Sequence, residues 1–380
     1  MTSFKKDIDR FGYHNNIFGF IRLLFASFVI IAHTPELIDG DNSRELLNRL
    51  FGTISFGTLA VDGFFIVSGY LIVGSFLKNP HPIPYLKKRI ARIYPAFIAS
   101  TLFCIIIVAP LAGATAADIW SSLGGNLRGI IILRPPSVPN VFSGSPYAAL
   151  NGAMWTISYE FQCYLLVLIL GLIGALRRPW MLSALAVICL IGYEQSYIHG
   201  QNQQLRLTGI FLFGSLFYLW RDRIVLTPAY TAMALAALLG FLFIPTLAEP
   251  AIAIFGSYVI FSIASFGGSW AIARINNSDD ISYGVYLYAW PIEKLILWYF
   301  PSANPLLAGT ATFLIACGFG WLSWRGLEKR VMRLSESWNP PLLLERKGAE
   351  ILRALGSRQN QAATPIERNI RPNRRHLDNV

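Results

Sequence analysis

The sequence predicts an all-α integral membrane protein, a bundle of about ten transmembrane helices with both termini in the cytoplasm. Three observations support this fold class. Of the 380 residues, 54% are hydrophobic and only 14% are charged, whereas soluble domains carry roughly 25% charged residues. Ten apolar runs approach or reach the length needed to cross a bilayer, about 20 residues. Lys and Arg are also distributed unevenly between the segments that join these runs.

The expected spans divide the chain into a polar cytoplasmic segment (residues 1–16), a transmembrane domain (17–333) and a basic tail (334–380). The tail is rich in Pro, Asn, Gln and Arg, which is typical of disordered segments. Its charge suits anionic lipid headgroups on the cytoplasmic side. The ten spans are expected over residues 17–36, 53–77, 93–112, 153–175, 180–198, 206–220, 228–247, 251–273, 281–300 and 305–324.

The orientation follows from the Lys and Arg residues, because these accumulate in cytoplasmic loops. If the N-terminus is inside, the inner segments contain most of them, even when the tail is left out of the count. Arg22 and Lys294 fall inside spans. The asymmetry predicts an N-in, C-in topology. The outer loops then contain only Arg44, Arg49, Arg128, Arg134 and Arg206.

The longest predicted loop covers residues 113–152 on the outer side. It includes a proline-rich stretch, residues 134–140, followed by Ser143-Gly144-Ser145-Pro146. Loops of this length are unusual unless they are functional. We therefore expect this loop to cover or shape a binding site.

The charge and the cysteines argue against two other classes of protein. The formal net charge is +11, but the cations lie between and after the apolar runs, which fits membrane orientation better than a nucleic-acid surface. Each of the four cysteines lies inside an apolar run, without a CxxC spacing. We expect them to be small buried side chains and predict neither disulfides nor a metal site.

The first predicted span contains two ionisable residues, Arg22 and His33. Eleven positions are about three helical turns, so both side chains lie on nearly the same face, roughly 16 Å apart along the axis. Arg22 then lies toward the inner surface and His33 in the outer half. Alone, the pair allows two interpretations. Either Arg22 extends to the headgroups and His33 caps the helix beside Thr34 and Pro35, or both residues serve a functional site.

Two acidic residues are expected at a similar depth on other helices. Asp62 lies in the second span among small residues that indicate close helix packing, and Glu160 lies about two turns into the fourth span. An acid in hydrocarbon needs a charged partner or a neutral form, and an imidazole or an arginine is a natural partner. Three ionisable residues from three helices at similar depth therefore favour a functional site formed by His33, Asp62 and Glu160, and the alternative is that all three are structural.

Four cations precede the third span, in residues 87–92 at its cytoplasmic start. Alone, this cluster is adequately explained by the preference of cations for the inner side. The functional alternative is a phosphate-binding site for a polyanionic cofactor, because cations beside a helix N-terminus suit phosphate groups.

Five motifs follow one another along the chain: Arg22 with His33, residues 61–70 (VDGFFIVSGY), 89–95 (RIARIYP), 155–160 (WTISYE) and 281–287 (ISYGVYL). In this order, the motifs resemble those of the membrane-bound acyltransferase-3 family, which includes O-acyltransferases of bacterial exopolysaccharide, O-antigen and nodulation oligosaccharides. Together the motifs cover roughly residues 15–330. One position departs from the family pattern, because members often carry a histidine where this chain has Tyr288-Ala289-Trp290-Pro291.

The resemblance implies transfer of an acyl group from cytoplasmic acyl-CoA, with acetyl-CoA favoured over succinyl-CoA, to a hydroxyl of a cell-surface polysaccharide or lipid-linked oligosaccharide. It places the chain in the bacterial inner membrane, in exopolysaccharide modification, with membrane lipid and polysaccharide assembly proteins as partners. His33 is then the base or a transient acyl acceptor, oriented by Asp62 or Glu160. The residues expected to bind the coenzyme are Arg22, Arg89, Arg92, Ser68 and Tyr159.

Two other functions remain open from the sequence. A transporter or flippase for an oligosaccharide or a small anion would use the buried charges to line its pathway, although the chain shows no symmetry between two halves. A scaffold for polysaccharide assembly would leave the buried ionisable residues without a purpose.

Overall fold

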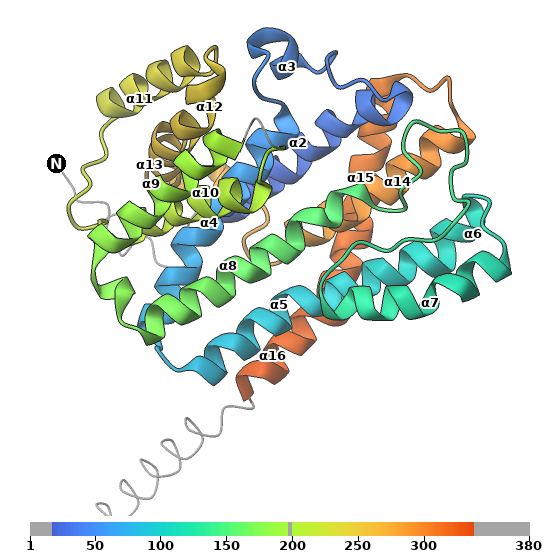
Figure 1. The fold of residues 1–380 in the computed structure, drawn as a ribbon, viewed down its shortest axis with the longest axis horizontal. Helices are drawn as coiled ribbons and strands as arrows, with labels where there is room; N and C mark the ends of the chain where they lie inside the picture. The colour runs from blue at the N-terminus through green and yellow to red at the C-terminus, as the bar shows by residue number, and fades with distance from the viewer. Residues whose placement is uncertain (1–16, 197–199, 338–380) are drawn as a thin grey trace, which may run out of the picture. The chain divides into compact units, whose positions relative to one another are not determined.

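The computed structural model describes residues 17–196 and 200–337. This part of the chain forms helices and no β-strand (Figure 1). The all-α class predicted from the sequence is therefore confirmed. The predictions for residues 1–16 and for the tail from residue 338 lie outside the described residues. The chain divides into two units, residues 1–333 and 334–380, and the following description concerns the first.

Each of the ten predicted apolar runs overlaps a helix. The helices are α2 (Phe18–Asp39), α3 (Leu46–Phe51), α4 (Phe56–Lys78), α5 (Pro82–Phe103), α6 (Ala109–Leu111), α7 (Ala116–Ile131), α8 (Trp155–Leu172), α9 (Pro179–Gln195), α10 (Gln203–Leu219), α11 (Pro228–Phe241), α12 (Pro245–Ala251), α13 (Ser257–Phe266), α14 (Ser282–Tyr299), α15 (Pro305–Ser323) and α16 (Lys329–Ser337). Short π-helical segments join α5 to α6, α12 to α13, and α15 to α16.

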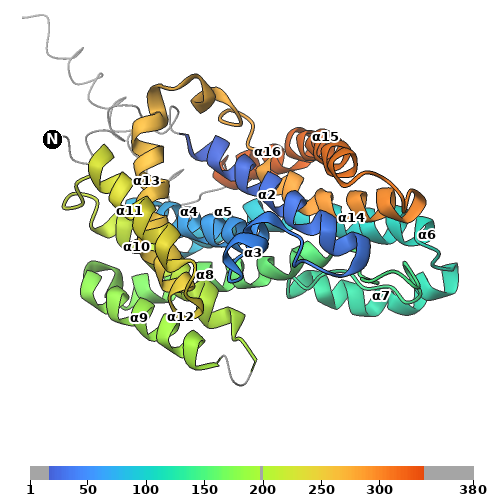
Figure 2. The same ribbon diagram turned by 90° about the horizontal axis from the view of Figure 1, so that it is seen from above.

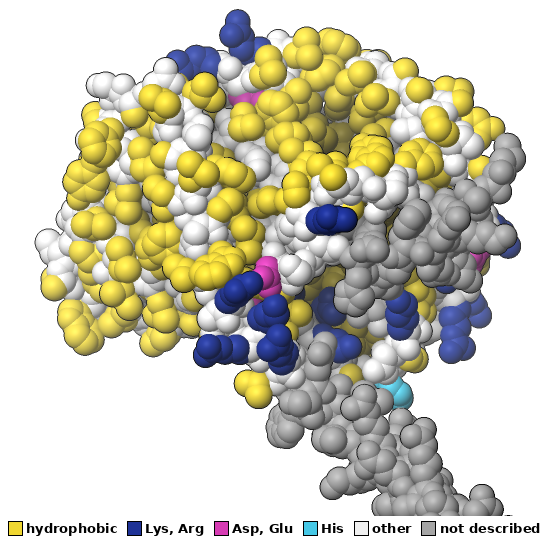
Figure 3. All heavy atoms as spheres, turned by 180° about the vertical axis from the view of Figure 1, so that it is seen from behind, with side chains coloured by type: hydrophobic (Ala, Val, Ile, Leu, Met, Phe, Trp, Pro, Cys, Tyr) yellow, Lys and Arg dark blue, Asp and Glu magenta, His cyan; other side chains and the backbone are white. Residues whose placement is uncertain are grey.

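Six helical segments of the described chain are long and apolar enough to cross a membrane. The chain is therefore a multi-pass membrane protein, while the number of ten spans and the orientation stay predictions. Figure 3 shows one face of the molecule, which is hydrophobic over most of its area, with Lys and Arg gathered mainly toward its lower edge. The six segments are Phe18–Asp39, Phe56–Lys78, Pro82–Leu111, Gly152–Leu172, Pro245–Ser269 and Pro305–Ser335.

Glycines allow α4 to approach α10 closely, as the small residues of the second span predict. A Cβ atom on Gly69 would lie 2.0 Å from the Phe211 carbonyl oxygen, and one on Gly214 would lie 2.0 Å from the Ile66 carbonyl oxygen. Since neither backbone could tolerate a side chain there, only glycine fits at this crossing.

Helices α2 and α14 lie side by side and run in the same direction (Figure 2). Arg22, near the start of α2, contacts Asp280, just before α14, whereas His33 contacts Trp290 three turns further along. We call the end of the bundle that holds Arg22 and Lys78 the inner end, and the opposite end the outer end, following the predicted orientation.

The segment predicted as a long outer loop, residues 113–152, contains a helix of 16 residues, α7. A capping box between Thr115 and Asp118 begins this helix, and the Thr-x-x-Asp spacing was the signal that hydropathy alone missed. α7 turns back along α5, where the Tyr94 hydroxyl donates to the Ile131 carbonyl at 2.8 Å. The chain then returns, and the Phe142 N–H donates to the Ala112 carbonyl at 2.9 Å.

Candidate active site

His33 and Glu36 form a hydrogen-bonded pair near the outer end of α2. Nδ1 of His33 lies 3.1 Å from Oε2 of Glu36, and both side chains are about one fifth exposed. The Trp290 ring packs against the imidazole in a T-shaped arrangement, with 4.6 Å between ring centroids. A carboxylate that accepts the proton on Nδ1 leaves Nε2 free to accept another proton. The pair thus has the arrangement of a general base with its orienting acid.

Residues 147–152 close over Trp290 and so border the same site. The indole N–H donates to the Ala149 carbonyl at 3.3 Å, and a Cβ atom on Gly152 would lie 2.5 Å from the indole ring. Tyr147 also packs on Trp290, at 6.2 Å between centroids. Burial, together with a hydrogen bond to the Glu36 carboxylate and its charge, raises the pKa of Tyr147. This part of the segment between α7 and α8 therefore forms a wall of the His33 site.

Asp62 pairs with an arginine, one of the two kinds of partner expected for it, and not with His33. Its carboxylate is completely buried and accepts from Arg206 Nη1 at 2.9 Å, while the same nitrogen donates to Glu249 at 3.1 Å. Across the described residues, no hydrogen bond or ion pair connects Asp62 with His33. The sequence had assigned Arg206 to an outer loop, so this pairing was missed. Asp62 holds α4 to α10 and α12, and its expected role of orienting His33 finds no support in the geometry.

Glu160 lies nearer the inner end than His33 and Asp62. Its carboxylate accepts from the Tyr164 hydroxyl at 2.5 Å and lies 3.4 Å from the Ser68 hydroxyl. Ser68 is six residues, or about 9 Å, beyond Asp62 along α4 toward Lys78. The structure thus places Glu160 nearer the inner end than Asp62, and each of the three residues of the expected catalytic centre has a different partner.

At the inner end, Asp280 accepts from two arginines. Arg22 contacts Asp280 directly, and Arg92 lies 2.8 Å from the same carboxylate oxygen. Burial opposes ionisation of Asp280, but the charges of the two arginines outweigh it and hold its pKa at about 2. Arg92 also lies 3.5 Å from Glu328. Two carboxylates therefore already neutralise much of the charge of Arg92.

Arg89 lies beside this cluster but has no carboxylate partner within the described ranges. Its guanidinium lies over the rings of Tyr85 and Tyr164, at 5.6 and 5.7 Å from their centroids, and it donates weakly to Ser75 at 3.4 Å. Its Nε is buried and has no hydrogen-bond partner among the residues described. Among the predicted coenzyme ligands, Arg89 is the cation with most capacity left for a phosphate group.

The other two predicted coenzyme ligands differ in their surroundings. Ser68 lies 3.4 Å from both Glu160 and the Tyr164 hydroxyl, so it belongs to the inner polar group beside Arg89. Tyr159 instead packs its ring against Trp155, at 5.7 Å between centroids. It makes no hydrogen bond to any described residue, and its place in coenzyme binding stays a prediction.

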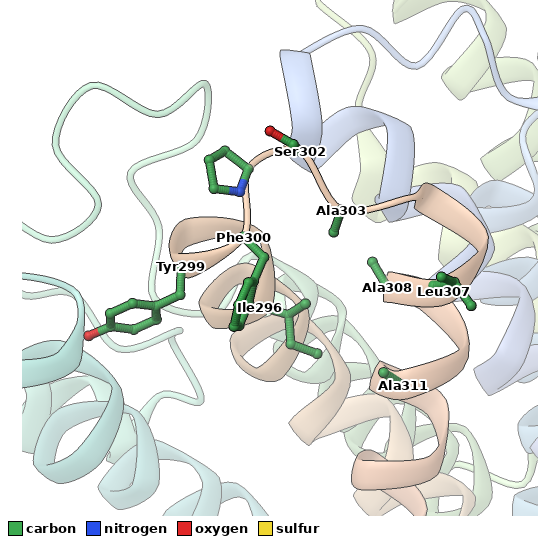
Figure 4. Close-up of a pocket in the computed structure, with 9 residues that line it drawn as sticks. Ile296, Tyr299, Phe300, Ser302, Ala303, Leu307, Ala308 and Ala311 are labelled. Atoms are coloured by element: carbon green, nitrogen blue, oxygen red, sulfur yellow. The ribbon is translucent and has the colours of Figure 1, made fainter.

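An apolar cavity of about 590 Å³ lies between the outer ends of α14 and α15 (Figure 4). A Cβ atom on Gly309 of α15 would lie 3.3 Å from the Thr34 hydroxyl of α2, so the cavity adjoins the helix end that carries His33. Its volume is within the range of ligand sites. The lining residues are Ile296, Tyr299, Phe300, Pro301, Ser302, Ala303, Leu307, Ala308 and Ala311.

Comparison with known proteins gives one family and several relatives. A family described as "Acyltransferase domain" matches residues 15–325. An O-acetyl transferase of Shigella phage Sf6 is 26% identical over 353 residues, which are 87% of this chain and 99% of the relative. The putative membrane-bound transacylase BcsY of Komagataeibacter xylinus is 23% identical over 70% of this chain and 74% of its own. Nodulation protein 10 of Rhizobium leguminosarum bv. viciae is 23% identical over 46% and 48%, respectively. No solved structure matches.

Proposed function

The chain belongs to the acyltransferase family that matches residues 15–325, and on this premise we propose that it transfers an acyl group from cytoplasmic acyl-CoA to a sugar hydroxyl outside. The acceptor is a cell-surface polysaccharide or lipid-linked oligosaccharide, and the protein resides in the bacterial inner membrane. Acetyl is the favoured acyl group, because a relative named O-acetyl transferase aligns over almost its whole length. Succinyl is the second candidate.

One relationship carries this proposal: α2 presents a cation at its inner end and a histidine–carboxylate pair at its outer end. Arg22 and His33 are eleven residues apart on one helix, which is about 16 Å along its axis. The phosphates of coenzyme A would contact Arg89, assisted by the Arg22 and Arg92 cluster. The long pantetheine arm would then extend through the bundle and bring the thioester toward His33.

The chemistry requires a base and a positioned acceptor. His33 Nε2 takes the proton of the sugar hydroxyl while the oxygen attacks the thioester carbonyl. The carbon–sulfur bond breaks, the coenzyme thiolate leaves, and the proton on His33 is returned to that sulfur. Glu36 stabilises the imidazolium that forms between these events. In an alternative route, His33 itself accepts the acyl group and then passes it to the hydroxyl.

A direct assay tests the proposed function. The protein, purified in detergent, is incubated with acetyl-CoA or succinyl-CoA, and the coenzyme thiol that is released when the acyl group passes to a hydroxyl or to water is measured. We expect thiol release, with a preference for acetyl-CoA, and no release by His33→Gln. A protein that moves oligosaccharides without chemistry would release no thiol from either donor, which would contradict the proposal.

The acceptor is identified by comparing surface polysaccharides from cells with and without the gene. Mass spectrometry detects the added acyl group, and NMR locates the hydroxyl that carries it. Identical spectra from both kinds of cells would rule out a surface polysaccharide as the acceptor.

A further inference from the structure

A second acid lies next to the His33 site, and neither the sequence motifs nor the proposed mechanism uses it. Glu293 of α14 is completely buried. Its Oε1 lies 2.5 Å from the hydroxyl oxygen of Thr34, the residue after His33. Its Oε2 has no hydrogen-bond partner within residues 17–196 and 200–337. No Lys, Arg or His of the described residues forms an ion pair with it.

The hydrogen bonds of Thr34 indicate the protonation state of Glu293. The Thr34 oxygen lies 2.5 Å from Glu293 and also 3.0 Å from the Ile30 carbonyl. A threonine hydroxyl has one proton, so both contacts are hydrogen bonds only if Glu293 brings the second. A neutral Glu293 then donates to Thr34, which donates to Ile30. An ionised Glu293 would be a buried charge without a counterion, which is far more costly.

We propose that Glu293 is a positioning residue: a neutral carboxylic acid that donates to Thr34 and thereby fixes the turn of α2 that carries His33 and Glu36. This inference rests on the proposed function of that site. The turn needs external support because Pro35 has no N–H to donate to the Ile31 carbonyl. The same face of α14 also supplies Trp290, which packs on the His33 ring. Two contacts from α14 therefore set the position of the imidazole.

Four variants test the proposal by kinetics of the purified protein. Glu293→Leu removes the donor and should lower kcat by about 10- to 100-fold, because a small displacement of a catalytic group has effects of this size. Its KM for acetyl-CoA should not change, since the coenzyme phosphates bind at the other end of α2. Glu293→Gln keeps a donor and should stay within about threefold of the parent, with the same pH profile.

Thr34→Val should reproduce the loss in kcat, because it removes the same hydrogen bond from the other side. The double variant Thr34→Val/Glu293→Leu should then be no slower than the slower single variant. Thr312→Val is the matched control, because the hydroxyl of this buried threonine of α15 makes no hydrogen bond to any residue that the structure describes. It should retain the parent's kcat.

Three results would overturn the inference. They are a normal kcat for Glu293→Leu, a loss in Glu293→Gln as large as in Glu293→Leu, and losses in the double variant that multiply. The second result would show that the reaction uses the carboxyl proton itself. If Glu293→Leu does not yield a monodisperse protein, Thr34→Val and Glu293→Gln decide the question. Failure of the parent protein to transfer any acyl group would instead count against the proposed function.

Discussion

Nδ1 of His33 lies 3.1 Å from Oε2 of Glu36, one turn further along the same helix. Glu36 is the acid in contact with the imidazole, whereas neither Asp62 nor Glu160 contacts His33 within the described part of the chain. The first prediction follows from it. His33→Ala and His33→Gln should lower acyl transfer by at least about a hundredfold, the lower scale for loss of a general base. Protein level and membrane insertion should stay normal. Near-normal transfer by His33→Gln would exclude His33 as the base.

The second prediction distinguishes the three acids. Glu36→Gln should reduce kcat by about tenfold or more, because the amide no longer stabilises the imidazolium. Asp62→Asn should act mainly on the amount of folded protein, since Asp62 pairs with Arg206. Both effects are measured on purified protein, as kcat and as yield of the monodisperse peak in size-exclusion chromatography. If Asp62→Asn folds normally and loses as much kcat as Glu36→Gln, the assignment of the acids is wrong.

The third prediction concerns the stability of the buried trio Asp62, Arg206 and Glu249. Arg206→Met should destabilise the protein by about 3–5 kcal/mol, because it leaves two buried carboxylates without a cation. Thermal unfolding in detergent should show the loss as a lower midpoint. Arg128→Met is the control, since Arg128 is exposed on α7 and should change the midpoint little. Equal midpoints for the two variants would mean that the trio contributes nothing to stability.

The fourth prediction separates Arg89 from Arg92 at the inner end. Arg89→Ala should raise KM for acetyl-CoA while the protein folds normally, because Arg89 has no carboxylate partner in the described chain. Arg92→Ala should instead reduce folded protein, since it leaves Glu328 without its arginine and removes one of the two arginines of Asp280. Steady-state kinetics and size-exclusion chromatography read out the two effects. An unchanged KM in Arg89→Ala would mean that the cations of residues 87–92 only orient the protein in the membrane.

The fifth prediction concerns pH. The two arginines hold the pKa of Asp280 at about 2, below its ordinary value of 3.8. A carboxyl with a depressed pKa contributes stability above its unfolded pKa and loses it as the pH falls through the folded one. The difference in unfolding midpoint between the parent and Asp280→Asn should therefore be constant from pH 5 to about pH 8. It should shrink as the pH falls from about 4 toward 2. A difference that already shrinks at pH 6 would contradict this pairing.

Features that depend on residues close together in the sequence could be predicted, whereas contacts between residues far apart in the sequence could not. Hydropathy located the helices, because backbone groups in lipid must be hydrogen-bonded within their own segment. It missed α7, because this helix has only 16 residues and polar residues interrupt its apolar ones, so that no apolar run of spanning length marks it. Glu36 could have been predicted as the partner of His33, because positions i and i+3 are neighbours on a helix. Arg206 could not have been predicted as the partner of Asp62, because it lies 144 residues away in the sequence.

That separation has a consequence for the synthesis of the protein. A ribosome that adds about 5–20 residues per second needs roughly 7 to 30 s to proceed from Asp62 to Arg206. During this interval α4 is complete, yet its carboxylate has no arginine to meet. Glu249 follows later still. The insertion machinery must therefore accept a helix whose acid has no arginine partner. The packing of α4 against α10 is completed only after α10 has been inserted.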